Sequence, residues 1–187
     1  MMRPQVIDDV LPDIDAYVEA TRRQAFATVE PVAGRIFHGI GRPVDLRLLY
    51  WIAVDRPRLM PTMTFLRQSP KAQVEPHFVH TDLDMGEWTG LFYLNPTPAP
   101  GDGTVFYRWR RTGEVQSTVE PGSAAQRDEV AAWSDAEQWE EWHRVAARCN
   151  RLVLFPARYF HSRAIPENYG EGDDARLLQV VFGTGKL

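Results

Sequence analysis

From residue 62 onward, short β-rich runs alternate with breaks that are rich in proline and glycine. Val, Phe, Tyr, Leu and Thr dominate the runs, which favours strands. Several short strands separated by turn signals are typical of an antiparallel sandwich or barrel. The runs cover residues 62–68, 77–82, 88–95, 104–109, 151–155 and 176–184. We therefore expect a mainly β fold with added helices.

Residues 1–60 contain two helical patterns. The first pattern follows Pro12 and Asp13, which suit the first turn of a helix. Its apolar side recurs at helical spacing in Ile14, Tyr17, Val18, Thr21 and Ala25. The second pattern, residues 43–54, places four apolar residues at helical spacing but also contains the β-rich run YWIAV. We favour a helix there and keep a strand as the alternative.

A third helical stretch is expected inside the β-rich region, at residues 124–148. Ser134 and Glu137 have the spacing of a capping box, and Glu140 and Arg144 have that of a helical ion pair. Trp133, Trp139 and Trp142 would dock this helix on a sheet. A polar loop precedes it, so the sequence predicts a helical insertion at about 113–149 within a core of residues 61–187.

Length and charge limit the classes of protein that fit. A chain of 187 residues suits one domain, residues 1–187, with a core that needs no disulfide bond. The net charge of −4 makes nucleic acid an unlikely partner, because phosphate binding requires a basic face. The single cysteine, the acidic N-terminal segment and the shortness of every apolar run predict a soluble cytoplasmic protein without a membrane segment. The oligomeric state stays open.

His80 and Asp82 form half of a candidate metal site. They lie in the run 77–82, and residues i and i+2 of a strand point to the same face. His161 follows another apolar strand and supplies a second imidazole. Two histidines and one carboxylate on one face of an iron ion are the ligand set of non-haem Fe(II) oxygenases.

Other titratable residues compete for these roles. His77 has the opposite parity to His80, so we expect it in the core rather than on the metal. Asp84 shares the parity of Asp82 but lies in an expected loop, where it is solvated or faces substrate. We interpret His38 and His143 as structural or surface residues.

The only basic cluster is residues 108–111, with one tryptophan among three arginines. Such a cluster could face an anionic substrate. An exposed strand whose arginine stems cover the tryptophan is the interpretation we favour. Trp88 could line the entrance of a pocket.

The order of motifs resembles the prolyl-4-hydroxylase-like branch of the 2-oxoglutarate/Fe(II) dioxygenases. After H-T-D come W-T-G-L-F-Y-L-N, G-D-G-T-V-F and N-R-L-V-L-F-P, then His161 and an arginine that opens the last strand. The resemblance covers about residues 62–184. The sequence departs from that pattern at Gly101-Asp102-Gly103, where the family has Gly-Gly, in the helical insertion, and in a slightly long gap before Arg176.

The resemblance implies a double-stranded β-helix, which is a distorted jelly roll, and a set of roles. His80, Asp82 and His161 would hold Fe(II), and 2-oxoglutarate would chelate the metal through its 2-oxo group and C1 carboxylate. Arg176 would bind the C5 carboxylate together with the Tyr93 hydroxyl. Reaction with O2 would release succinate and CO2 and hydroxylate a C–H bond, with ascorbate as the reductant in vitro. An aspartate at residue 82, where halogenating relatives have a small residue, favours hydroxylation.

The substrate is less defined by the sequence than the site. A small chain without a separate recognition domain favours a small molecule, an amino acid or a short peptide. Arg163 and Arg158 are the other candidates for binding a carboxylate. Two further classes stay open, namely a cupin-like metal enzyme that does not use 2-oxoglutarate and a catalytically silent binding module on the same fold.

Overall fold

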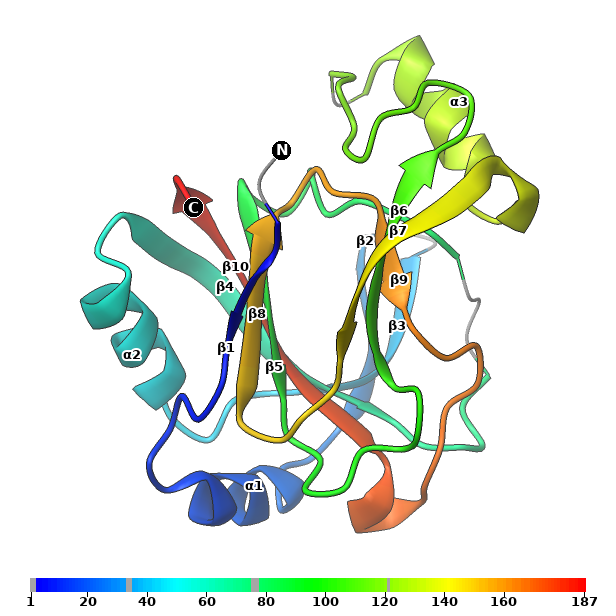
Figure 1. Ribbon diagram of the computed structural model, residues 1–187. Coiled ribbons are helices and arrows are strands. Elements are labelled where there is room, and N and C mark those ends of the chain that lie inside the picture. The colour runs from blue at the N-terminus through cyan, green and yellow to red at the C-terminus, as the bar shows by residue number, and fades with distance from the viewer. Residues whose placement is uncertain (1–2, 33–34, 75–77, 121) are drawn as a thin grey trace.

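The computed structural model describes the chain except residues 1–2, 33–34, 75–77 and 121. Two antiparallel sheets face each other in the part of the chain described (Figure 1). The larger sheet has the spatial order β1 (Gln5–Ile7), β8 (Arg151–Pro156), β5 (Trp88–Tyr93), β10 (Arg176–Gly185), β4 (Leu59–Ser69), β3 (Arg35–Gly41) and β2 (Ala27–Val32). The smaller sheet has the order β7 (Trp139–Ala146), β6 (Gly103–Trp109) and β9 (His161–Arg163).

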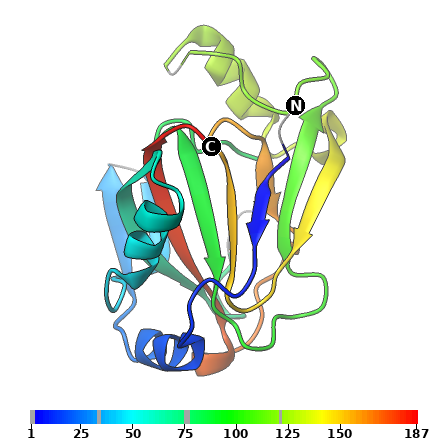
Figure 2. The same cartoon turned by 60° about the vertical axis from the view of Figure 1, so that its left-hand side comes forward.

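Helices cover the outside of this pair of sheets. The structure contains α1 (Ile14–Arg22), α2 (Arg47–Asp55), α3 (Ala124–Ala132) and the short 3₁₀ helices η1 (Ala136–Gln138) and η2 (Gly172–Asp174). Helices α1 and α2 lie against the larger sheet, whereas α3 lies beyond one end of the smaller sheet (Figures 1 and 2). The end that carries α3 is also the end at which β8 leads into β9.

Side-chain alternation divides the interior into two cores. Along β5, Trp88 and Phe92 face outward and pack with residues of α1 and α2, while Leu91 and Tyr93 face the smaller sheet. Phe155 of β8 and Phe106 of β6 meet between the sheets, with ring centroids 4.9 Å apart. The space between the sheets is therefore lined mainly by apolar side chains.

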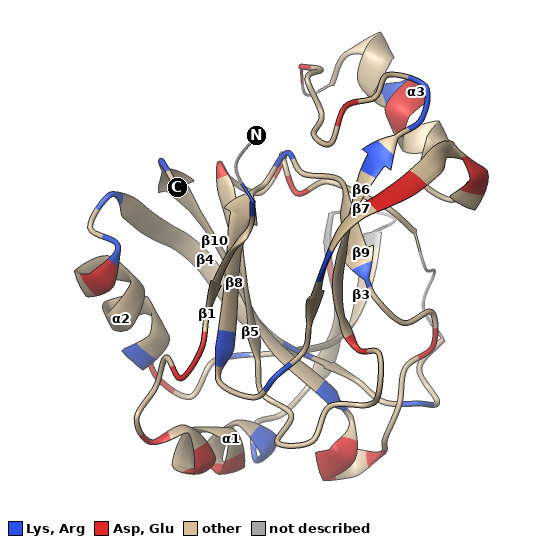
Figure 3. Cartoon of the chain, in the orientation of Figure 1, with Lys and Arg blue, Asp and Glu red and all other residues tan. Residues whose placement is uncertain are grey.

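Charged residues lie mostly on helices, loops and strand ends (Figure 3). Three charged residues of the described chain are nevertheless buried: Asp102, Glu129 and Arg176. A buried charge is costly unless it is paired and hydrogen-bonded, so these residues need a structural or functional explanation.

The predicted strands at 62–68, 88–95, 104–109, 151–155 and 176–184 are confirmed as β4, β5, β6, β8 and β10. The helix predicted for residues 43–54 is also confirmed as α2, so the alternative strand there is wrong. Residues 1–60 are less helical than expected, because they also contain β1, β2 and β3. Strands β2 and β3 form an edge hairpin whose alternating apolar residues were not recognised.

The predicted helix at 124–148 is only partly correct. Helix α3 ends at Ala132, and residues 139–146 form β7, which pairs with β6. Pairing satisfies the backbone of this segment and buries Trp139 and Val145, so tertiary contacts override its helical pattern. The insertion is thus a helix followed by a strand of the smaller sheet.

The local signals assigned to that helix are wrong for the same reason. Ser123, not Ser134, caps α3 by accepting a hydrogen bond from the Gln126 backbone N–H. Glu140 and Arg144 do not pair with each other, because Glu140 lies 3.6 Å from Arg108 across the strands and Arg144 binds Glu141 at 2.6 Å.

Candidate metal centre

A two-residue backbone bridge brings His80 and His161 together. The N–H of each residue donates to the carbonyl of the other, and both N···O distances are 2.9 Å. The two imidazole rings lie 4.4 Å apart, and His161 also pairs with Phe106 of β6. The loop that carries His80 is thereby fixed beside the edge of the smaller sheet.

Asp82 reaches the same point from a turn rather than from a strand. Its backbone N–H donates to the Ala157 carbonyl at 2.8 Å, and its Oδ2 accepts a 2.8 Å hydrogen bond from Thr89. Oδ1 lies 3.8 Å from Nε2 of His80, and Oδ2 lies 3.4 Å from Nε2 of His161. The candidate ligand atoms of the three residues all lie within 4.8 Å of one another.

The predicted triad is therefore brought together, but not through the strand that was expected. In the described part of the run 77–82, the pairing is an isolated bridge at His80. His77 falls outside the described residues. A turn replaces the strand after His80, and in this turn the Met85 N–H donates to the Asp82 carbonyl at 2.8 Å. The Asp82 carboxylate lies next to the histidines in this arrangement.

Backbone carbonyls orient both imidazoles. Nδ1 of His161 lies 3.0 Å from the Tyr159 carbonyl, and Nδ1 of His80 lies 3.4 Å from the Phe78 carbonyl. A carbonyl can only accept, so each Nδ1 carries the hydrogen and each Nε2 keeps its lone pair. Both lone pairs are thus available to a cation next to the Asp82 carboxylate, which is the usual arrangement of histidines that bind metals.

Electrostatics also favour the ligand forms of these side chains. Burial, followed by the repulsion that a protonated His161 exerts, lowers the pKa of His80 to about 4. Burial acts to raise the pKa of Asp82, but the positive charge that the histidines carry when protonated and the hydrogen bond from Thr89 outweigh it and hold the pKa below its ordinary value. A neutral imidazole beside an ionised carboxylate is the protonation state that a divalent cation needs.

Arg176 and Tyr93, the residues assigned to the co-substrate, lie on the two central strands of the larger sheet. The Tyr93 hydroxyl lies 2.6 Å from the Thr104 hydroxyl of β6 and so bridges the two sheets. Burial raises the pKa of Tyr93 to about 12, which keeps the hydroxyl protonated and able to donate. Arg176 is buried, and its Nε donates to both carboxylate oxygens of Asp102, at 3.0 and 3.2 Å.

Asn95 fixes the start of β10, where Arg176 lies. Its side-chain amide donates to the Ala175 carbonyl at 2.8 Å, and its Oδ1 accepts from the Leu177 N–H at 2.7 Å. The two bonds hold the backbone on both sides of Arg176. In the motif Y-L-N, Tyr93 therefore provides a hydroxyl, Leu94 packs in the core, and Asn95 holds the backbone on both sides of Arg176.

The insertion borders the metal centre through Trp133. The Trp133 ring stacks on Phe78 with centroids 6.1 Å apart and meets His80 edge-on at 6.3 Å. The Trp133 carbonyl accepts from the Val79 N–H at 3.0 Å. The residue that ends α3 thus contacts the segment that carries the first histidine.

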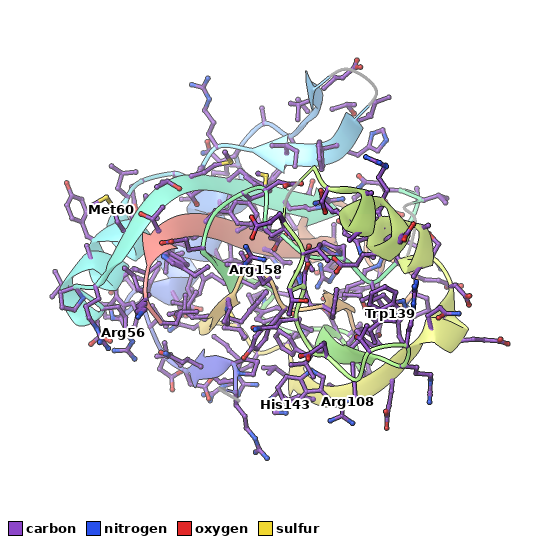
Figure 4. The ribbon with its side chains drawn as sticks, turned by 90° about the horizontal axis from the view of Figure 1, so that it is seen from above. Arg56, Met60, Arg108, Trp139, His143 and Arg158 are labelled. Carbon is purple, nitrogen blue, oxygen red and sulfur yellow. The ribbon has the colours of Figure 1, made fainter. Side chains whose placement is uncertain are left out.

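The remaining candidates are not part of the triad. Asp84 is exposed, as expected, and His38 bonds to Thr28 at 3.0 Å. His143 lies on β7 rather than on a helix. In the view from above, Arg108, Trp139 and His143 lie on the side of the smaller sheet (Figure 4).

Arg158 and Arg163, the other candidates for binding a carboxylate, have different surroundings. In the same view Arg158 lies near the middle of the molecule (Figure 4), where its Nη1 donates to the Val119 carbonyl at 3.1 Å. Arg163 binds the Asn168 side chain at 2.8 Å.

The favoured interpretation of the basic cluster is confirmed only in part, because β6, which carries Arg108 and Trp109, is mostly buried rather than exposed. Trp109 is buried and stacks on Trp139 with centroids 5.9 Å apart, while the Arg111 guanidinium lies over the Trp109 ring. Arg110 donates to the Trp139 carbonyl at 3.1 Å. The arginine stems therefore cover a structural tryptophan.

Sequence reasoning missed several residues that support the site, namely Thr89, Asn95, Asp102 and Tyr169. The signal for Asp102 was present as the departure from Gly-Gly, since a carboxylate in a buried turn requires a donor. Asn95 and Tyr169 contact segments that are distant in sequence, and Thr89 contacts Asp82 across a turn, so no strand or helix periodicity reveals these contacts.

Comparison with solved structures confirms the predicted double-stranded β-helix fold. The chain is similar to the non-haem alpha ketoglutarate dependent carbocyclase SnoK from nogalamycin biosynthesis, with a TM-score of 0.58 and 16% identity over 95% of this chain and 78% of SnoK. AviO1 from Streptomyces viridochromogenes gives a TM-score of 0.54 and 16% identity, over 96% of this chain and 89% of AviO1. Iron-bound HygX from Streptomyces hygroscopicus gives a TM-score of 0.52 and 16% identity, over 95% of this chain and 80% of HygX.

At the level of sequence, residues 62–177 match a family of unknown function, DUF6445. No curated protein matches the chain. Among the described residues, none of the helices is long and apolar enough to cross a membrane. The matched segment runs from β4 to the start of β10 and so includes all three residues of the triad.

Proposed function

The chain belongs to DUF6445, a family of unknown function, and we propose that it is an Fe(II)- and 2-oxoglutarate-dependent dioxygenase. The observation that carries this proposal is the meeting of His80, Asp82 and His161 with both Nε2 lone pairs and one carboxylate directed to a common point. Two imidazoles and one carboxylate that leave several positions open suit non-haem iron in oxygen chemistry.

The donor set supports iron rather than a purely structural metal. The three residues offer three ligand atoms, whereas structural zinc sites are closed by four protein ligands. In the comparison set, HygX was solved with nickel and 2-oxoglutarate bound, and the SnoN epimerase was solved with Fe3+ and alpha ketoglutarate. Those ligands belong to those proteins, and they support the proposal for this chain by similarity of fold.

The co-substrate would be held by Arg176 and Tyr93. In the described part of the chain, the hydrogen bonds of the Arg176 side chain involve Nε alone, so its two terminal nitrogens remain as donors. The Tyr93 hydroxyl and the Arg176 guanidinium lie close enough to influence each other electrostatically. A cation and a hydroxyl in a buried, largely apolar setting suit a carboxylate, which leaves the other end of the molecule for the metal.

The protein would contribute binding and orientation. Thr89 orients the Asp82 carboxylate, and the Tyr159 and Phe78 carbonyls orient the two imidazoles. With iron and 2-oxoglutarate bound, the site would use O2 as the oxidant, with one oxygen atom going to 2-oxoglutarate as it becomes succinate and CO2 and the other to a substrate C–H bond.

We propose hydroxylation of a small molecule as the reaction. Small molecules suit this site because Trp133 and Phe78 flank His80 and narrow the approach to the metal. The SnoN epimerase was solved with nogalamycin RO, which is in line with a small-molecule substrate on this fold. We also include an amino acid or a short peptide among the proposed substrates. We further propose that the protein is cytoplasmic and that it belongs to the prolyl-4-hydroxylase-like branch.

The test is a succinate assay. Protein, Fe(II), ascorbate, O2 and 2-oxoglutarate are incubated with a panel of small molecules, and succinate is measured with and without each one. We expect succinate formation that is lost in His80→Ala and falls sharply in Arg176→Ala. An iron-loaded protein that forms no succinate across the panel would instead support a cupin-like metal enzyme or a silent binding module.

A further inference from the structure

The buried ion pair between Arg176 and Asp102 is not explained by the fold alone. The Arg176 and Asp102 side chains are only 7% and 1% exposed, and Nε of the arginine lies 3.0 Å from Oδ1 of the aspartate. Asp102 accepts two further hydrogen bonds, from the Gly103 N–H at 2.6 Å and from the Tyr169 hydroxyl at 2.9 Å. The carboxylate is therefore rigidly held against the arginine.

We propose that Asp102 is a resident counter-ion that sets, and weakens, the affinity of the pocket for the distal carboxylate of 2-oxoglutarate. This inference rests on the proposed function. Without ligand, one positive and one negative charge balance in a buried site. With ligand, two carboxylates share one guanidinium, so their mutual repulsion offsets part of the attraction that Arg176 provides.

Substitution of Asp102 by asparagine separates charge from orientation. The asparagine carbonyl can accept from the Gly103 N–H and from Nε of Arg176, as Oδ1 does now. The amide nitrogen can donate to the Tyr169 hydroxyl, which accepts as readily as it donates. Asp102→Asn thus removes the negative charge and keeps the shorter hydrogen bond from Nε of Arg176, while the longer one, at 3.2 Å to Oδ2, is lost.

A matched control exists at the start of β8, beside the end of β1. Asp8 pairs with Nε of Arg151 at 2.6 Å, so Asp8→Asn makes the same chemical change on the same arginine atom. That pair is partly exposed, because the Asp8 side chain is 33% exposed. We expect Asp8→Asn to change the affinity for 2-oxoglutarate, and for an analogue without the distal carboxylate, by no more than about twofold.

The experiment measures equilibrium binding of two ligands to the Fe(II)-loaded protein under anaerobic conditions. The probes are 2-oxoglutarate and 2-oxopentanoate, which has the same metal-chelating end but lacks the distal carboxylate. We expect Asp102→Asn to bind 2-oxoglutarate about tenfold more tightly. Its affinity for 2-oxopentanoate should stay within about twofold of the wild-type value, because that ligand carries no charge toward Arg176.

Thermal unfolding provides a second readout. Ligand-free Asp102→Asn should melt roughly 5–10 °C below wild type, since Arg176 loses its counter-charge, and 2-oxoglutarate should raise its melting temperature more than that of wild type. If the asparagine variant does not fold, Asp102→Ser is measured in the same way. Wild-type protein that binds neither ligand would overturn the proposed function and this inference together. Wild-type protein that binds 2-oxoglutarate, with unchanged or weaker binding in the neutral variants, would overturn this inference alone.

Discussion

Nε2 of His161 lies 3.4 Å from Oδ2 of Asp82, although the whole insertion separates the two residues in sequence. Two sets of backbone hydrogen bonds create this contact, namely the mutual bridge between His80 and His161 and the bond from Asp82 to the Ala157 carbonyl. The geometry of the candidate metal centre is thus set by the backbone before any side chain contributes. Side-chain substitutions at the triad should remove ligands and leave the fold intact.

Replacement of His161 by alanine should abolish high-affinity Fe(II) binding. The variant loses one of the three ligand atoms, and the remaining two cannot hold the cation tightly. Anaerobic titration calorimetry with Fe(II) measures the loss. His143→Ala is the control, since His143 lies on β7 outside the triad, and it should bind Fe(II) as wild type does. Equal iron affinity in the two variants would contradict the assignment.

Thr89→Val should weaken Fe(II) binding by about tenfold while the melting temperature changes little. Valine has the shape of threonine but cannot donate to Oδ2 of Asp82, so the carboxylate loses its orientation. Thr62→Val removes a longer hydrogen bond, to the Phe182 carbonyl at 3.3 Å, and serves as the control. The same titration applies to both variants, and a loss of affinity in Thr62→Val alone would count against the role of Thr89.

Asn95→Ala should reduce both stability and 2-oxoglutarate affinity. The variant leaves the Leu177 N–H and the Ala175 carbonyl without their partner, which costs about 2–4 kcal/mol in urea-induced unfolding. Asn150→Gly removes two similar hydrogen bonds, to the backbone of Leu11, at a positive φ that glycine tolerates. It should lose stability but keep its ligand affinity, because it is not attached to the start of β10. If the two variants bind 2-oxoglutarate equally, Asn95 does not position Arg176.

Glu129→Gln should stabilise the protein at neutral pH. Burial raises the pKa of Glu129 above its ordinary value of 4.5, against the lowering effects of Ser117 and Arg158. The folded state therefore holds this proton more strongly than the unfolded state does. The associated stability is complete below pH 4.5 and is lost as the pH rises through the folded pKa.

The glutamine variant should lack that loss, so its free energy of unfolding should fall less between pH 4.5 and pH 8 than that of wild type. Urea unfolding at a series of pH values measures the difference. The exposed neighbour Asp128 provides the control, because Asp128→Asn should leave the pH profile of wild type unchanged. A profile of Glu129→Gln that matches wild type would show that Glu129 is ionised without cost.

Much of the fold was predictable from the sequence because β4, β5, β6, β8 and β10 carry their own apolar runs and turn signals. Strand β7 was not, since Trp139 and Trp142 have the spacing of a helical stripe and only pairing with β6 shows that they lie on a strand. Local pattern cannot report a partner strand that lies far away in the sequence.

The candidate site was predictable in its chemistry but not in its construction. His80, Asp82 and His161 were predicted as metal ligands and are brought together in the structure, yet a turn rather than the expected strand parity joins His80 to Asp82. The departure from Gly-Gly marks Asp102, but its pairing with Arg176 was not predicted, since the pairing depends on how the turn before β6 meets the start of β10. Local motifs supply the reactive groups, and tertiary contacts set their charge balance.

The most direct test of the account is a calorimetric titration of 2-oxoglutarate into the protein loaded anaerobically with Fe(II). We expect one 2-oxoglutarate to bind per iron-loaded chain, with binding that is lost when the metal is removed and lost again in His161→Ala. An iron-loaded chain that binds no 2-oxoglutarate, or that binds it equally well without His161, would contradict the central claim.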